Sequence, residues 1–172
     1  LLYFDFYALG NLRSLRKVRE TAGIAMLLGC ASTSGQTDLL RQPDHREWQR
    51  RAPGTYVAEF ETTKGNFAIE VIREWAPRGA DHFYNLVRLG YYDDTRFHRV
   101  LPNYIVQWGL HGDPEVNRIW ANRKIRDDSI PQKSSNVRGT IGFAMRGPTD
   151  RGTQDYTRFA EQVNPVTPDQ TL

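Results

Sequence analysis

The fold is decided by a stretch that reads Phe97-His98-Arg99-Val100, then Pro102, Tyr104-Ile105, Gln107 and Gly109. Its composition predicts two short strands separated by a proline turn. Residues two apart share one face of a strand, so Phe97 and Arg99 are expected together, and so are Ile105 and Gln107. A guanidinium and an amide then converge beside apolar side chains. This combination suits the binding of a peptide bond at proline.

The chemistry of that bond explains why these residue types are informative. Rotation about an X-Pro bond meets a barrier of about 20 kcal/mol, because the nitrogen lone pair is delocalised into the carbonyl. A guanidinium that donates to the prolyl nitrogen stabilises the twisted transition state more than either planar state. Arg99 is the candidate donor, Gln107 the candidate holder of the substrate carbonyl, and Tyr104, Ile105 and Tyr156 the candidate apolar floor. In the alternative interpretation, Arg99 and Gln107 are ordinary solvated strand positions.

Three other stretches of the chain belong to the same family pattern as this one, in the same order and with the same spacing. They are Glu61-Thr62-Thr63-Lys64-Gly65, residues 76–93 with Ala76-Pro77 and Gly90-Tyr91-Tyr92-Asp93, and residues 139–154 with Gly147-Pro148 and Thr153-Gln154. Over residues 54–160 the chain resembles the cyclophilins, which are peptidyl-prolyl cis-trans isomerases, and we take it for a bacterial member. The resemblance implies a mainly β fold, an antiparallel β-barrel with a capping helix, and isomerase activity without a cofactor or metal.

The resemblance also implies the site and its partners. It assigns Arg99 and Gln107 as catalytic, and assigns substrate contacts to Phe97, Tyr104, Ile105, Ala144, Met145, Gln154 and Tyr156. The expected partners are proline-containing peptides and unfolded client proteins, and the expected state is a monomer. The alternative function is a non-catalytic proline-peptide binder or chaperone-like fragment.

The sequence departs from the family pattern near its end. Asp155 puts a charge into a strand that should be buried, and the proline-containing tail up to Leu172 is a poor final strand. We therefore expect a domain that lacks about its last quarter. An open barrel would expose an unpaired strand edge and lose stability.

Pattern and turn signals predict an N-terminal extension over residues 1–53 and a domain over residues 54–172. Within the domain, residues 56–61 and 66–72 are expected to form a hairpin, and residues 77–89 a helix that ends at Gly90. Further strands are expected at residues 96–101, 104–108 and 140–146. Residues 110–138 are expected to be loop, with Asp127 and Asp128 solvated, and residues 37–52 to be a polar linker with at most a brief helix around residues 44–50.

The single cysteine excludes an internal disulfide and has an informative context. Met26-Leu27-Leu28-Gly29-Cys30 resembles a bacterial lipobox, and Arg13, Arg16, Lys17 and Arg19 supply a basic region before it. This pattern predicts a lipid on Cys30, membrane attachment and a location in the cell envelope or periplasm. The alternatives are a buried or unreactive cysteine and a cytoplasmic protein.

The charge pattern argues against other classes of function. The formal net charge is only +3, and the basic residues are scattered, so nucleic-acid binding is not expected. The four histidines, His45, His82, His98 and His111, lie too far apart in sequence to suggest a metal site. The sequence thus favours an isomerase or a peptide-binding module.

Overall fold

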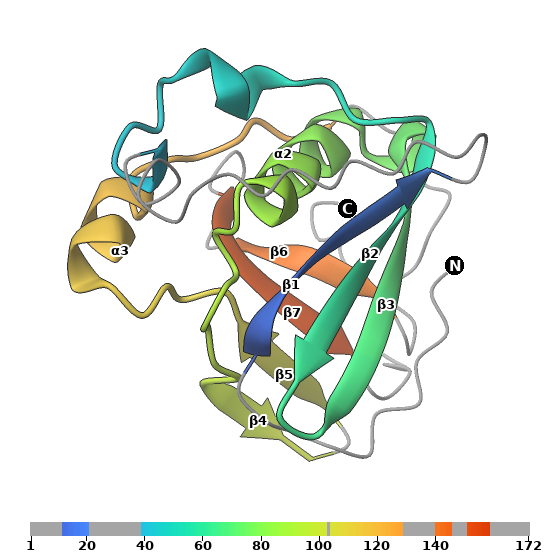
Figure 1. Ribbon diagram of the computed structural model, residues 1–172, viewed down its shortest axis with the longest axis vertical. Coiled ribbons are helices and arrows are strands. Elements are labelled where there is room, and N and C mark those ends of the chain that lie inside the picture. The colour runs from blue at the N-terminus through green and yellow to red at the C-terminus, as the bar shows by residue number, and fades with distance from the viewer. Residues whose placement is uncertain (1–11, 21–38, 103, 129–139, 146–150, 159–172) are drawn as a thin grey trace.

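The structure is a computed structural model that describes residues 12–20, 39–102, 104–128, 140–145 and 151–158 (Figure 1). Its strands form two antiparallel sheets. The first sheet has the order β1-β2-β3 and the second the order β4-β5-β7-β6. The strand-rich fold agrees with expectation. Within the described residues no strand is shared between the two sheets, so these residues do not form the closed barrel that was expected.

The first sheet contains β1 (Leu12–Glu20), β2 (Thr55–Thr62) and β3 (Gly65–Ile72). The hairpin of β2 and β3 is confirmed, and its turn places Gly65 at a φ of 133°, which favours glycine. Alternate residues of β2 are buried, namely Tyr56, Ala58 and Phe60. β1, the segment predicted to be the basic region of a leader, pairs with the other edge of β2.

The second sheet contains β4 (Arg99–Leu101), β5 (Ile105–Trp108), β6 (Ile141–Met145) and β7 (Arg151–Arg158). β4 and β5 form the predicted hairpin, although the first strand begins at Arg99 rather than at Arg96. β7 lies between β5 and β6. Asp155 pairs in register with Trp108 on one side and Phe143 on the other, and both of these partners are buried.

Helix α2 (Pro77–Arg88) agrees with the predicted helix and follows a short 3-10 turn, η2 (Arg73–Trp75). Phe83, Leu86 and Val87 form its buried stripe. The helix ends in a Schellman motif, because the N–H of Gly90 donates to Val87 and that of Tyr91 to Leu86. Gly90 has a φ of 74°, which a residue with a Cβ adopts only at a cost.

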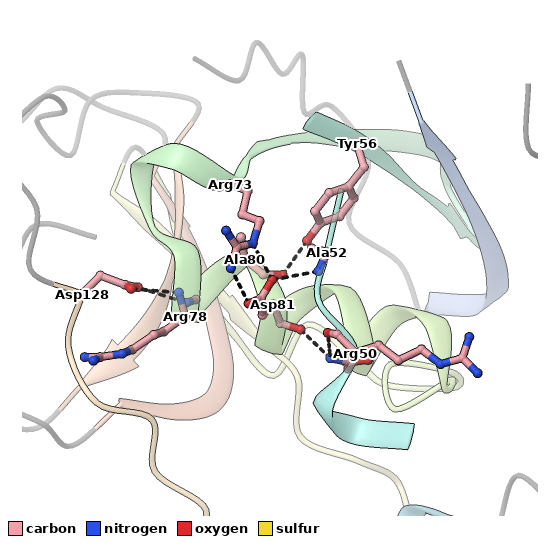
Figure 2. A network of polar contacts seen from close by, with 10 residues as sticks. Arg50, Ala52, Tyr56, Arg73, Arg78, Ala80, Asp81 and Asp128 are labelled. Atoms are coloured by element: carbon pink, nitrogen blue, oxygen red, sulfur yellow. Dashed lines mark hydrogen bonds and ion pairs between the residues drawn. The ribbon is translucent and has the colours of Figure 1, made fainter. Parts of the chain in front are cut away.

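The N-terminus of α2 has a cap that the sequence did not reveal. Ala76 precedes the helix and has no side-chain acceptor. The carboxylate of Asp128 instead accepts from the backbone N–H of Arg78 at 2.8 Å and of Gly79 at 3.0 Å (Figure 2). The prediction of a solvated acidic pair was therefore wrong for Asp128, because its partner donors lie far away in sequence.

The prediction of loop throughout residues 110–138 was also wrong. Helix α3 (Pro114–Trp120) begins where Asp113 accepts from the backbone N–H of Glu115 at 2.8 Å. Val116 and Trp120 are one helical turn apart and both are buried. The aspartate-proline start was a readable helix signal, but turn residues on either side obscured a helix of only seven residues.

Residues 39–52, the described part of the predicted polar linker, pack against the helices. They contain the 3-10 turn η1 (Arg46–Gln49), and Leu40 and Ala52 are buried. The indole of Trp48 meets that of Trp120 edge to face, with ring centroids 4.5 Å apart. Trp120 also donates to the Leu40 carbonyl at 2.7 Å. This ring contact and this buried hydrogen bond are among the interactions that hold the segment on the domain.

Asp81 on α2 joins three segments of the chain (Figure 2). Its carboxylate accepts from Arg73 Nε and Nη2, both at 2.8 Å, and from the backbone N–H of Ala52 at 2.8 Å. Burial acts to raise the pKa of Asp81, but the hydrogen bonds from Arg73 and Ala52 outweigh it and lower the pKa. Nearby, the hydroxyl of Tyr56 donates to the Ala80 carbonyl at 2.8 Å. This network fixes α2 relative to β2.

Candidate functional site

The β4-β5 hairpin brings the two polar residues of the site together. Arg99 and Gln107 are direct register partners, and Arg99 Nη1 donates to Gln107 Oε1 at 2.9 Å. Arg99 is exposed and Gln107 is half-buried. The N–H of Tyr104 closes the turn by donating to the Leu101 carbonyl at 3.1 Å. Arg99 and Gln107 are eight residues apart in the sequence, and they lie side by side because the two strands run antiparallel.

The hydrogen bond orients the amide of Gln107. A guanidinium has donors only, so the amide must offer Arg99 its oxygen. The Nε2 group of Gln107 then points away from Arg99 with two N–H bonds. The pair can therefore present donors from both residues to one bound carbonyl and nitrogen.

Across the sheet, one row of register partners continues from this pair. Gln107 on β5 pairs with Tyr156 on β7, and Tyr156 pairs with Gly142 on β6. Ala144 lies two residues further along β6 and is half-buried. The fold therefore places segments far apart in the sequence on adjacent strands, and β7 separates Gln107 from Ala144. Met145, Gln154 and Tyr156 are placed only by backbone position, on β6 and β7.

Apolar side chains gather around the hairpin. Ile105 is buried, whereas Tyr104 is 39% exposed. Outside β1, β7 and Met145, where only the backbone is described, the exposed large hydrophobic side chains lie on the hairpin or beside its ends, namely Val100, Leu101, Tyr104 and Leu110. Exposed apolar groups beside a cation and an amide favour contact with a partly apolar ligand. Sequence reasoning did not single out Val100, Leu101 and Leu110; the first two lie on β4, an edge strand of the second sheet.

Phe97 does not lie where strand alternation predicted. Its ring packs 6.1 Å from that of Trp108 and 6.3 Å from that of Phe67, measured between centroids, against the core. The expected pairing of Phe97 with Arg99 on one face was wrong, because the regular strand begins only at Arg99. Phe97 thus supports the hairpin from the core rather than lying beside the guanidinium.

The pKa of His98 depends on its burial and on its charged neighbour Arg99. Partial burial lowers the pKa of His98, and the positive charge of Arg99 lowers it further. The lowered pKa keeps His98 mainly neutral at pH 7, so Arg99 is the cation of the hairpin site. Within the described part of the chain, no group of three histidine, cysteine or acidic residues is arranged to hold a metal ion.

Cys30 lies outside the described residues. Every helix in the part that the structure describes is too short or too polar to cross a membrane.

Comparisons with known proteins give a consistent result. Residues 57–164 match the family model described as cyclophilin type peptidyl-prolyl cis-trans isomerase/CLD. The chain is 35% identical over 102 residues to peptidyl-prolyl cis-trans isomerase-like 1 of Gibberella zeae, covering 59% of the chain and 63% of the relative. It is 34% identical over 108 residues to peptidyl-prolyl cis-trans isomerase-like 3 of Rhizopus delemar, covering 58% and 63%.

A third relative has a different kind of name. The spliceosome-associated protein CWC27 homolog of Xenopus laevis is 36% identical over 108 residues, covering 61% of the chain and 23% of the relative. The chain thus spans less than two thirds of the length of each of these relatives. All three are eukaryotic, so the predicted bacterial origin has no support among them, and the predicted truncation has none either.

Proposed function

This chain belongs to the cyclophilin-type peptidyl-prolyl cis-trans isomerase family, and on that premise we propose that it catalyses rotation about X-Pro peptide bonds. The observation that carries the proposal is the Arg99–Gln107 pair, with 2.9 Å between Nη1 and Oε1, on an apolar and accessible hairpin. The substrates are exposed prolines in peptides and unfolded proteins.

The mechanism follows from donor chemistry alone. As the X-Pro bond twists, the prolyl nitrogen regains its lone pair and becomes a better acceptor. Arg99 donates to that nitrogen, and the contact is strongest in the twisted state, which lowers the barrier. The Nε2 group of Gln107 donates to the substrate carbonyl, while Ile105 and Tyr104 contact the pyrrolidine ring. Backbone groups near Ala144 hold the peptide in an extended form.

The experiment measures isomerisation of a short Ala-Pro peptide by magnetisation-exchange NMR with the full chain. We expect Arg99→Ala to lower the rate by about 100-fold, the usual cost of losing a transition-state donor. Arg118→Ala is the control, because Arg118 is an exposed arginine on α3. Equal rates above background for the wild type and Arg99→Ala would reject the assignment.

A second candidate function is proline-peptide binding without turnover. The observation that favours it is the CWC27 homolog, a relative whose name describes an association with the spliceosome rather than catalysis. The same peptide separates the two functions. Chemical-shift changes at the hairpin without accelerated exchange would indicate binding alone, whereas shifts confined to distant loops would contradict both functions.

A lipid anchor on Cys30, with a location in the cell envelope, stays one proposal for the mature protein, and an unmodified cytoplasmic chain that keeps β1 is the alternative. Cleavage before Cys30 would remove residues 12–20 and therefore the whole of β1. The mass of the intact protein purified from its source cells tests them. A lipidated N-terminal cysteine would support the anchor, and a protein that retains β1 would contradict it.

A further inference from the structure

Among the described strands, β1 is the one that pairs with the edge of β2 that faces away from β3. β2 is paired on one side with β3 through the hairpin and on the other side with β1 (Figure 1). β2 also carries core side chains, with Tyr56 and Ala58 completely buried. An unpaired edge on such a strand presents a row of N–H and C=O groups that readily accept another strand.

The two strands have complementary charges in register. Arg13 pairs with Glu61 and Lys17 with Glu59, whereas Arg19 pairs with Val57. Opposite charges at directly facing positions stabilise a strand pair, and like charges destabilise it. The edge of β2 is therefore suited to a basic strand and unfavourable to an acidic one.

The way in which β1 is connected differs from an ordinary hairpin. Thr63 and Lys64 alone separate β2 from β3, whereas residues 21–54 separate β1 from β2. Such a long connection does not impose the register of β1, which must come from the strand contacts themselves. The pairing also shifts register between Arg13 and Lys17, which interrupts the ladder in the middle of β1.

We propose that the outer edge of β2 is a strand-docking site for a basic extended segment, and that residues 12–20 of the same chain are its releasable occupant. The long connection keeps β1 at a high effective concentration near the edge, so the edge stays filled under ordinary conditions. A basic extended peptide presented in trans competes for the same edge when β1 is weakened. The proposal is independent of the isomerase site, which lies in the other sheet.

Charge reversal in the full chain tests the selectivity. Lys17→Glu faces Glu59, while Arg19→Glu makes the same change in net charge opposite Val57 and serves as the matched control. We expect hydrogen exchange at the β2 amides that face β1 to rise by about two- to five-fold in Lys17→Glu but not in Arg19→Glu. Adding Glu59→Lys to Lys17→Glu should restore slow exchange. Equal effects of the two single variants would overturn the charge selectivity.

Docking in trans is tested by weakening β1 without shortening the chain. Consecutive N–H groups of a strand point to opposite sides, so the double variant Lys17→Pro with Val18→Pro removes a ladder donor whichever residue faces β2. We expect fast exchange at the β2 edge in this variant, and renewed protection when a free peptide with the sequence of residues 12–20 is added. The same peptide with glutamate at positions 13 and 17 should give less protection.

Two results would overturn the proposal. Unchanged exchange at the β2 edge in the double proline variant would show that β1 does not cover it. Protection in the wild type that appears only at high protein concentration would assign the edge to a second copy of the chain rather than to its own β1.

Discussion

Arg99 donates to Gln107 across the β4-β5 hairpin, at 2.9 Å between Nη1 and Oε1, and the two residues are direct register partners. One short contact thus fixes two groups. The guanidinium is held in place on an exposed edge strand, and the amide is turned so that its Nε2 group faces away from the cation. Under the proposed function Gln107 has two roles: its oxygen holds Arg99, and its Nε2 group donates to the substrate carbonyl. Substitutions can separate these roles.

Gln107→Glu and Gln107→Ala separate those roles. The glutamate still accepts from Arg99 but has no Nε2 group, whereas alanine removes both functions. If donation to the substrate carbonyl matters, both variants should lose about ten-fold in kcat/KM, because one hydrogen bond contributes about 1 to 1.5 kcal/mol. Exchange NMR with the Ala-Pro peptide measures the loss. Full activity of Gln107→Glu would limit Gln107 to orienting Arg99.

Asp128→Ala should lower the free energy of unfolding by about 1 kcal/mol, the usual value of an N-cap. The carboxylate satisfies the N–H groups of Arg78 and Gly79 and lies at the positive end of the α2 dipole. Asp128→Asn keeps an acceptor but loses the charge, so its loss should be smaller. Urea unfolding followed by circular dichroism measures both variants. A wild-type midpoint for Asp128→Ala would show that water replaces this cap.

The Arg73–Asp81 pair should matter more for stability than a similar pair at the surface. Asp81 also binds the N–H of Ala52, and only 29% of its side chain is exposed. We expect Asp81→Asn to cost about 2 kcal/mol. Asp44 also makes two bonds to Arg123, at 2.6 and 2.7 Å, but its side chain is 81% exposed. Asp44→Asn should therefore cost less than Asp81→Asn, and equal losses would contradict the argument from burial.

His82 should make the fold sensitive to acid. Its Nε2 atom is buried and has no hydrogen-bond partner in the described part of the structure, and its ring lies 5.3 Å from that of Phe143. Burial lowers its pKa from 6.5 to about 4. The unfolded chain therefore takes up the proton at a higher pH than the folded chain does. Stability present above pH 6.5 should fall as the pH drops towards 4, by a total on the order of 3 kcal/mol.

The measurement for His82 is the free energy of unfolding in urea at several pH values between 7.5 and 4. His82→Leu is the comparison, because it removes the titrating group and keeps an apolar side chain on α2. Its stability should depend less on pH over this interval. Parallel pH profiles for the two proteins would assign the acid sensitivity to other groups, such as His98 and His111, whose pKa values burial also lowers.

Local patterns in the sequence determined several elements of this protein. The two-residue turn predicted the β2-β3 hairpin, Pro77 and Gly90 marked the two ends of α2, and Pro102 separated β4 from β5. In each case the signal lies within a few residues of the structure that it specifies. The antiparallel hairpin also followed from such local signals, and with it the approach of Arg99 to Gln107.

Tertiary structure decided everything that depends on partners far away in the sequence. Asp128 caps a helix that begins about 50 residues earlier, and β1 pairs with β2 across a long connection. Phe97 packs on the core because the rings of Phe67 and Trp108 offer an apolar contact there, and its position in the strand pattern does not predict this. From the sequence alone, Asp128 is read as a solvated loop residue, β1 as part of a leader and Phe97 as one position of an alternating strand. Their actual roles depend on hydrogen-bond donors, a strand edge and an apolar surface that exist only once the chain has folded.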